Sequence, residues 1–228
     1  MPRLYICHCP IACGDRRPIL EEHLKKRGFD DVRWITDYSV EHPFVKWLHK
    51  RLGETTRLSH ISGLVKNLEM FLDVARDTTD ETQFWQCNDD VVFIKNWDID
   101  IPKKLEYVNL SVGVSFHIIP DGKPRILGNN GGAEVFYFTR KFARLVLNNV
   151  DTRQTIDIII HGLLNYIGHP LVCIPIAHQT SILEPKNSTL VVDETLPPWI
   201  PFVEQFKPTG ISYEDLRNES GFFARDDA

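Results

Sequence analysis

Residues 84–93 read FWQCNDDVVF, an apolar and aromatic run that an amide and two carboxylates interrupt at positions 88–90. Burying adjacent carboxylates is costly unless a cation or hydrogen-bond donors offset the charge. Because β-favouring residues resume at Val91, we expect the triplet Asn88-Asp89-Asp90 at a strand end or a kink, facing a cleft. Open α/β sheets bind ligands at such strand ends. The stretch therefore predicts a ligand site in which a divalent cation pairs with the carboxylates.

The segment before this stretch predicts the opening unit of an α/β fold. Arg3 to Cys9 reads as a strand, and GDRRP at 14–18 reads as a turn into a helix that Gly28 ends. A second strand is predicted at 32–35, and Asp37 follows it directly. The order strand, helix, strand, carboxylate is typical of nucleotide-binding α/β domains. Asp37 is accordingly a candidate contact to a uracil base or a ribose, with a simple turn residue as the alternative.

The remaining elements follow from the spacing of apolar residues. Helical spacing predicts helices over 58–75, 140–148 and 156–167, and a short amphipathic helix or a packed loop over 43–51. Residues that favour β structure predict strands over 112–119, 133–139 and 171–176, and residues 103–107 read as a helical turn. We expect one α/β domain over residues 1–184. A C-terminal extension over 185–228, around one short amphipathic piece, would pack on it or trail from it.

The composition excludes several classes of function. Of the 228 residues, 43% are hydrophobic and 25% are charged, as in an ordinary globular chain with one domain. A net charge of −5 without a basic tract argues against nucleic acid as the main partner. No apolar run approaches the roughly 18 to 20 residues that span a bilayer, and the N-terminus lacks the apolar core of a signal peptide. We therefore expect a cytoplasmic protein without a transmembrane segment.

The five cysteines do not predict a secreted disulfide framework, because their number is odd and three lie in one short segment. Those three, Cys7, Cys9 and Cys13, could bind zinc together with His8. Adjacent positions of a strand point to opposite faces, however, and no CxxC pair completes a tetrahedral site. Simple burial of reduced cysteines is the more usual arrangement.

Four short blocks, in order along residues 1–180, carry a resemblance to a known enzyme family. They are DRRP at 15–18, GE at 53–54 with LSH at 58–60, NDDV at 88–91, and GGA at 131–133 leading to ARL at 143–145 with Asp157 downstream. In this order they resemble the family 25 glycosyltransferases, typified by lipopolysaccharide-biosynthesis and procollagen galactosyltransferases. The resemblance implies a GT-A fold, a single α/β domain with a mostly parallel mixed sheet flanked by helices. Such a domain binds a nucleotide sugar across the first half of the sheet and an acceptor across the second.

The resemblance also implies a divalent metal, Mn²⁺ or Mg²⁺, at the acidic triplet. Asp90 is the expected direct ligand, and Asp89 is the expected contact to the ribose or the sugar. Family members usually have Glu where this chain has Asn88, which can orient the ion or its waters but brings no charge. The ion would then depend more on Asp90, on the nucleotide diphosphate and on His178, which we expect after the last strand. A solvated acidic turn and an ordinary loop histidine are the alternatives.

A sugar transfer also needs a base that takes the proton of the acceptor hydroxyl. Asp157 is the candidate, because partial burial between Ile156 and Ile158 would raise its pKa toward a useful value. A carboxylate that simply stabilises a helix N-terminus is the alternative. The other candidate binding residues are Arg16, Arg17, Arg57 and His60 for the diphosphate or base, Gly131 and Gly132 for close backbone approach, Glu134 for a sugar hydroxyl, and Trp85, Trp97 and Trp199 for stacking on sugar rings unless they pack in the core.

The predicted function is a metal-dependent, inverting glycosyltransferase that moves a hexose from a UDP-sugar to a glycan or a protein-linked acceptor. Two alternatives stay open. One is a catalytically silent nucleotide-sugar-binding module or one domain of a multi-transferase, which the uncharged Asn88 favours. The other is a metal-dependent nucleotidyltransferase or phosphohydrolase, which needs similar acidic metal sites.

Overall fold

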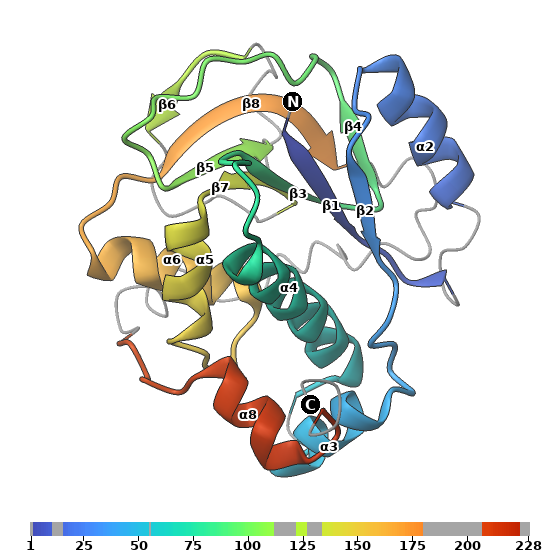
Figure 1. The fold of residues 1–228 in the computed structure, drawn as a ribbon, viewed down its shortest axis with the longest axis vertical. Helices are drawn as coiled ribbons and strands as arrows, with labels where there is room; N and C mark the ends of the chain where they lie inside the picture. The colour runs from blue at the N-terminus through green and yellow to red at the C-terminus, as the bar shows by residue number, and fades with distance from the viewer. Residues whose placement is uncertain are drawn as a thin grey trace, which may run out of the picture.

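A mixed β-sheet with helices on both faces forms the protein (Figure 1). The computed structural model describes residues 2–10, 16–54, 56–111, 122–126, 134–179 and 207–223, without the side chains of Arg125, His178 and Gln179. The strands of the sheet are β1 (Arg3–Cys7), β2 (Val32–Ile35), β3 (Phe84–Asn88), β4 (Val91–Phe93), β5 (Tyr107–Ser111), β6 (Arg125–Ile126), β7 (Val135–Phe138) and β8 (Val172–Gln179). The helices are α2 (Arg16–Lys26), α3 (Pro43–Arg51), α4 (Leu58–Arg76), α5 (Arg140–Leu147), α6 (Ile156–Tyr166) and α8 (Tyr213–Ser220).

The strands lie in the order β2-β1-β3-β7-β5-β8-β4, and β6 also pairs with β8. Parallel pairs join β1 to β2, β1 to β3 and β5 to β8. The other four pairs are antiparallel, because β7 runs against both of its neighbours and because β4 and β6 both run against β8. The prediction of a mostly parallel sheet was therefore wrong, although the mixed α/β class is correct.

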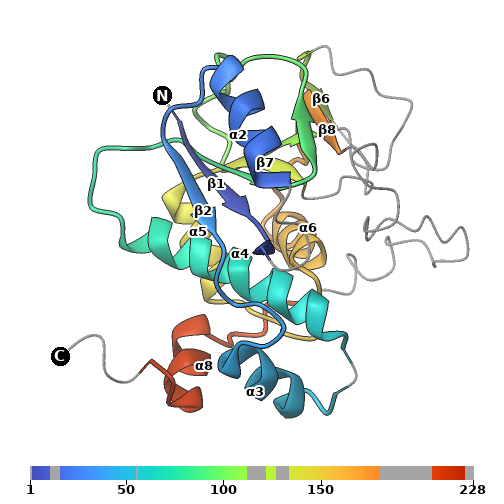
Figure 2. The ribbon, with the colours of Figure 1, turned by 90° about the vertical axis from the view of Figure 1, so that its right-hand side faces the viewer.

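Side chains alternate between two apolar clusters, as the pleat of a strand requires. Tyr5, Phe84 and Tyr107 face one cluster, which α3, α4, α5, α6 and α8 cover. Their neighbours Leu4 and Trp85 face the other cluster, which α2 covers. Figure 2 shows α2 and α4 on opposite sides of β1 and β2. Both faces of the central strands are buried, which explains why these strands read as apolar runs in the sequence.

Local signals placed most helices correctly. Pro43 occupies the first turn of α3, where its missing N–H is not needed. The hydroxyl of Thr139 accepts a hydrogen bond from the backbone N–H of Phe142, so it caps α5 as the sequence predicts. The predicted helix over 58–75 is α4. Helix α8 lies within 185–228, where the sequence predicts one short amphipathic piece. The packed-loop alternative for 43–51 is wrong, because this segment is the helix α3.

Two boundaries differ from the sequence prediction, and one predicted strand is not tested. Tyr107 begins the strand β5 and does not end a helical turn, because its register with Phe138 of β7 places it in the sheet. Residues 112–119, predicted as a strand, lie outside the described residues. The last strand continues to Gln179, because β4 offers it an antiparallel partner, so His178 lies within β8 opposite Val92 and not after the strand. Among the described residues, no helix is long and apolar enough to cross a membrane.

Candidate functional site at the carboxyl edge of the sheet

The carboxyl ends of β1, β2 and β3 lie at one edge of the sheet, because these three strands are parallel and in register. Cys7 at the end of β1 is opposite both Ile35 of β2 and Asn88 of β3. The antiparallel β7 begins at the same edge, and the backbone N–H of Asn88 donates to the carbonyl of Glu134, 2.9 Å away. This edge therefore collects the acidic triplet and Glu134. The triplet lies at the end of β3 with its two carboxylates in a turn, as the sequence predicts.

Asp89 is bound on both carboxylate oxygens by side chains of the protein. The Nδ1 atom of His8 lies 2.7 Å from Oδ2, and Nη1 of Arg16 donates to Oδ1 over 3.0 Å. All three side chains are buried. His8 is itself positioned through its backbone carbonyl, which accepts a hydrogen bond of 2.8 Å from Nζ of Lys66 in α4. The predicted contacts of Asp89 with a ribose or sugar, and of Arg16 with a diphosphate, stay predictions.

His8 and Lys66 were not predicted as partners of the acidic triplet. The sequence contained one signal for His8, since it directly follows the first strand and so reaches the same edge as the end of β3. The zinc hypothesis for His8 with Cys7, Cys9 and Cys13 gains no support. Among the described residues, which leave out Cys13, no three His, Cys, Asp or Glu side chains form a group that could hold a metal.

Asp90 and Glu134 are two further buried carboxyl groups at this edge, each exposed by 7%. Burial raises the pKa of Glu134, a hydrogen bond from Ser111 opposes this shift, and the negative charge of Asp90 adds to it. The Ser111 hydroxyl donates to Oε2 of Glu134 over 2.7 Å, and the backbone N–H of Ser111 donates to the Asn109 side chain. The structure thus brings the predicted metal ligand Asp90 within electrostatic reach of Glu134, a residue predicted only as a contact to sugar.

The donor set at this edge fits an ion that the substrate helps to bind. Mg²⁺ is usually held by one or two carboxylates together with substrate phosphates, so Asp90 and Glu134 suffice as the protein's share. Asn88 accepts a hydrogen bond of 3.0 Å from Nε2 of Gln86 on its Oδ1 atom. An amide oxygen has two lone pairs, so a contact to the ion stays open to Asn88. The roles of Asn88, Asp90 and His178 as metal ligands stay predictions, and the side chain of His178 is outside the described part.

Asp157 lies in the first turn of α6 and is half-buried. Its charge acts on the buried hydroxyl of Tyr107, which has no hydrogen-bond partner among the described residues. Burial raises the pKa of this hydroxyl well above its usual value, and the charges of Asp157 and Glu134 raise it further. Asp157 and Glu134 therefore act electrostatically on one hydroxyl, although Tyr107 begins β5 at the end of β7 opposite Glu134. The position of Asp157 at a helix N-terminus also fits the electrostatic alternative.

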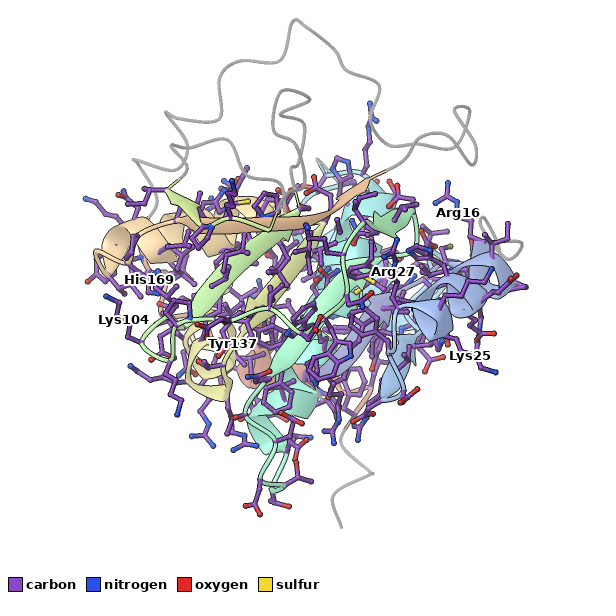
Figure 3. All side chains as sticks on the ribbon, turned by 90° about the horizontal axis from the view of Figure 1, so that it is seen from above. Arg16, Lys25, Arg27, Lys104, Tyr137 and His169 are labelled. Carbon is purple, nitrogen blue, oxygen red and sulfur yellow. The ribbon has the colours of Figure 1, made fainter. Side chains whose placement is uncertain are left out.

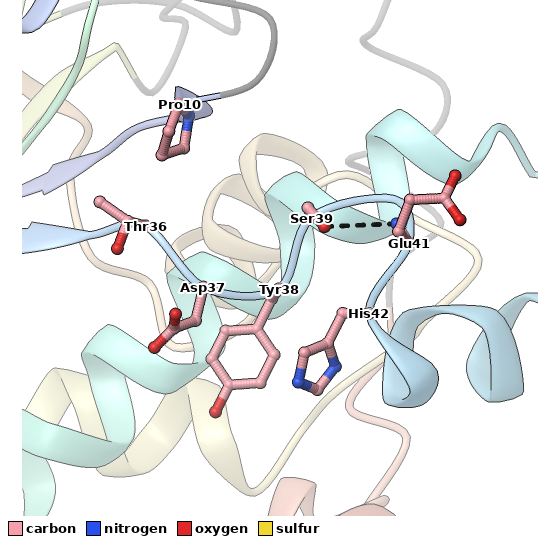
Figure 4. Close-up of a pocket in the computed structure, with 7 residues that line it drawn as sticks. All are labelled: Pro10, Thr36, Asp37, Tyr38, Ser39, Glu41 and His42. Atoms are coloured by element: carbon pink, nitrogen blue, oxygen red, sulfur yellow. Dashed lines mark hydrogen bonds between the residues drawn. The ribbon is translucent and has the colours of Figure 1, made fainter. Parts of the chain in front are cut away.

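A shallow pocket of about 330 Å³ opens at the carboxyl ends of β1 and β2 (Figure 4). Asp37 lines it, as expected for a residue that follows β2. The remaining lining residues are Pro10, Thr36, Tyr38, Ser39, Glu41 and His42. Tyr38 has a positive φ of 63°, which is uncommon for a tyrosine. The hydroxyl of Ser62 in α4 donates to the backbone carbonyl of Tyr38 over 2.6 Å.

Several predicted residues lie elsewhere. Arg57 and His60 are exposed at the start of α4, roughly 9 to 14 Å along the helix from Lys66 at about 1.5 Å per residue. Trp85 is fully buried, so it packs in the core. The Nε1 atom of Trp97 lies 3.3 Å from the position of a Cβ on Gly28, whose φ of +79° also favours glycine. Gly131, Gly132 and Trp199 lie outside the described residues.

A second shallow pocket, of about 290 Å³, lies at the C-terminal end of α2. Because α2 begins at the carboxyl edge with Arg16, this pocket is at the other end of the helix, and Figure 3 shows Arg16 apart from Lys25. Its lining combines basic residues of α2 with the segment that follows β4, namely Lys25, Lys26, Arg27, Gly28, Asn96, Trp97 and Asp98. Basic side chains at a helix C-terminus are stabilising without any ligand.

Comparisons with known proteins leave the family open. No family model matches the chain, and no curated protein matches it. Among solved structures, the chain is similar to the inositol-1-phosphate CTP transferase from T. maritima. The TM-score is 0.39 and the sequence identity is 13%, over 90% of this chain and 97% of that chain. A likeness at this level carries no argument about activity, so the site's own geometry must carry the functional conclusion.

Proposed function

We propose that this protein is a transferase whose substrate carries a nucleoside diphosphate group, bound at the carboxyl edge of the sheet. One observation carries the proposal: parallel β1, β2 and β3 end together, next to a pocket lined by Asp37 and beside the buried pair Asp90 and Glu134. Ligands of open α/β sheets bind at such an edge. Buried carboxyl groups beside a pocket are also what a cation-assisted phosphate site requires.

The nucleoside would occupy the pocket, where the carboxylate of Asp37 can accept hydrogen bonds from ribose hydroxyls. The diphosphate would then lie over the turn at Asp89 and Asp90. Asp90 and Glu134 would hold Mn²⁺ or Mg²⁺, which neutralises the leaving diphosphate when bound. Asp89 contributes differently, because its charge is already offset by Arg16 and its contact with His8 fixes the turn.

Glycosyl transfer is the first specific reaction that we propose, and the order of the four sequence blocks supports it. The bond between C1 of a hexose and the β-phosphate oxygen of UDP breaks, and an acceptor hydroxyl oxygen of a glycan or glycoconjugate bonds to C1 from the opposite face. The acceptor proton passes to Asp157. The half-buried position of Asp157, whose charge acts on the same hydroxyl as that of Glu134, supports it as the base.

Nucleotidyl transfer is the second candidate, and the structural neighbour named above has an activity of this class, although the likeness itself carries no weight. In this reaction a phosphate oxygen of a sugar phosphate attacks the α-phosphate of a nucleoside triphosphate, and pyrophosphate leaves. The same pair of carboxyl groups could hold the metal ion. A binding module without catalysis remains the third possibility, because Asn88 replaces a charged residue.

The identity of the released product separates these reactions. Thermal unfolding is first measured with UDP-, GDP- and CDP-sugars and with CTP and UTP, each with and without Mn²⁺, because a ligand of the folded state raises its stability. Release of UDP from a UDP-sugar supports glycosyl transfer, and release of pyrophosphate from a triphosphate plus a sugar 1-phosphate supports nucleotidyl transfer. Binding without either product indicates the silent module. Absence of any nucleotide-dependent shift refutes the proposal as a whole.

A further inference from the structure

Two side chains of α8 bind one partly buried carboxylate of α4, that of Glu69, whose side chain is 14% exposed. The hydroxyl of Tyr213 donates to Oε1 of Glu69 over 2.8 Å, and Nη1 of Arg217 donates to Oε2 over 2.7 Å. Tyr213 is fully buried, and its ring lies edge-on against that of Phe44 in α3, with 6.2 Å between the centroids. Figures 1 and 2 both show α8 beside α3 at the end of the molecule away from β8.

The same carboxylate lies beside Tyr38, which lines the pocket at the ends of β1 and β2. Burial raises the pKa of the Tyr38 hydroxyl, and the charge and hydrogen bond of Glu69 raise it further. The ring of Tyr38 also approaches that of Phe223, directly after α8, with centroids 6.5 Å apart. The guanidinium of Arg217 lies 3.8 Å from the centroid of Phe223. We name Tyr38, Glu69, Tyr213, Arg217 and Phe223 the Glu69 cluster.

The backbone of Tyr38 needs such support. Its positive φ is a conformation that a tyrosine keeps only when surrounding contacts hold it there. Ser62 binds the carbonyl of this residue, and the side chain contacts the Glu69 cluster, the apolar cluster under α3 and α4, and His42, whose ring centroid is 4.7 Å away. In Figure 4 the Tyr38 ring extends from the pocket segment on the side away from Pro10, beside His42.

We propose that α8 belongs to the binding apparatus, and that Glu69 and Arg217 are positioning residues that hold the pocket wall, residues 36–42, in its binding conformation by gripping Tyr38. The ligand class is the nucleoside portion of the substrate, so this inference rests on the proposed function. The physical reason is that Asp37 directly precedes Tyr38. A rotation of the Tyr38 backbone would therefore carry the Asp37 carboxylate out of the pocket.

Ion pairs between α8 and the rest of the chain supply matched controls. Arg51 of α3 donates two hydrogen bonds of 2.9 Å to Glu219, and Arg76 of α4 donates one of 3.1 Å to Glu214. Both pairs connect α8 to the body of the protein, as Arg217 does, but neither touches Tyr38. Arg217→Gln and Glu69→Gln therefore loosen the Glu69 cluster, and Arg51→Gln and Arg76→Gln loosen α8 alone.

The test measures nucleotide affinity and local exchange in the intact chain. The probe is the nucleotide that raises the unfolding temperature most in the screen described under Proposed function. We expect Arg217→Gln to raise Kd or KM for this nucleotide by about tenfold and to retain kcat, because charge-assisted hydrogen bonds are lost. Arg51→Gln should change affinity less than about twofold. Arg217→Lys, which keeps the charge, should recover part of the loss. Equal losses in Arg217→Gln and Arg51→Gln would overturn the inference, because they would show a general effect of α8.

Hydrogen exchange separates this inference from the proposed function. Amides of residues 36–42 should exchange faster in Arg217→Gln than in Arg51→Gln, whatever ligand the protein takes, because local opening reports the support of that segment. If the wild-type protein binds no nucleotide but this difference appears, the proposed function fails and the positioning role stands. If exchange of this segment is the same in both variants, the positioning role is refuted even where nucleotide binds.

Discussion

Replacement of Arg16 by methionine tests whether Asp89 is a buried carboxylate that depends on a partner. Their side chains are exposed by 7% and 11%, and the Nη1 to Oδ1 distance is 3.0 Å. Removing one partner of a buried ion pair costs about 3 to 5 kcal/mol, because the remaining charge stays buried. His8 still lies 2.7 Å from the other oxygen of Asp89, so we expect a loss near the lower bound, about 3 kcal/mol in the free energy of unfolding.

Urea unfolding at neutral pH, followed by tryptophan fluorescence, measures this loss as a shift of the midpoint at constant slope. Lys26→Met is the control on the same helix, since its pair with Glu22 is 70% exposed on both sides and an exposed pair contributes little to stability. The double variant Arg16→Met, Asp89→Leu should recover most of the loss, because no charge is then left behind. A loss for Arg16→Met no larger than that for Lys26→Met would refute the reasoning and show that Asp89 is solvated.

Three further predictions address the metal, the base and a buried histidine. Asp90→Asn should remove the Mn²⁺-dependent part of nucleotide binding seen by thermal shift, whereas loss of binding without regard to Mn²⁺ would contradict its role as a ligand. Asp157→Asn should leave nucleotide binding intact and lower turnover by about 100-fold or more, and normal turnover would exclude it as the base. Burial lowers the pKa of His161 to about 4 from 6.5, so the folded state disfavours protonation. Its stabilising contribution is complete above pH 6.5 and is lost as the pH falls, by about 2 kcal/mol between pH 7 and 5. His161→Leu should flatten that part of the stability profile, and an unchanged profile would show that other groups cause it.

The parts of the fold that the sequence predicted correctly depend on local signals. The period of apolar residues in α4 and the cap at Thr139 act within a few residues, so they are legible without the rest of the chain. The strand from Phe84 to Asn88 likewise ends where the two carboxylates begin, at Asp89. The direction in which strands pair is a long-range property, and for this reason the sheet was predicted as mostly parallel although β7 reverses it.

The separation of β3 from β4 shows the same limit. Val91 to Phe93 continues the apolar pattern of β3 in the sequence, yet it pairs with β8 at the far end of the sheet. The turn at Asp89 and Asp90 therefore separates two strands that are not neighbours in the order of the sheet. No local pattern distinguishes this from a kink within one strand. The extension of β8 through His178 follows from the same pairing, so both errors have one cause.

The candidate site was predictable in its position but not in its partners. A carboxylate at a strand end is visible in the sequence, whereas the contact of Asp89 with His8 joins residues 81 positions apart and exists only in the folded chain. Glu134 was singled out beside Gly132, but its closeness to Asp90 depends on the antiparallel pairing of β3 and β7.

The two adjacent carboxylates of the triplet act on different groups, and the coupling of Asp90 to Glu134 supports the proposed ion. Asp89 is balanced inside the protein by Arg16, in a network that Lys66 and His8 tie to α4 and β1. The negative charge of Asp90 raises the pKa of the buried carboxyl group of Glu134, and like charges in one site are costly together. Because Asp89 holds the turn, Asp90 stays within electrostatic reach of Glu134, and the folded chain carries this repulsion. An ion that arrives with the substrate's phosphates would relieve it at the moment of binding, which links the stability of the turn to the occupancy of the site.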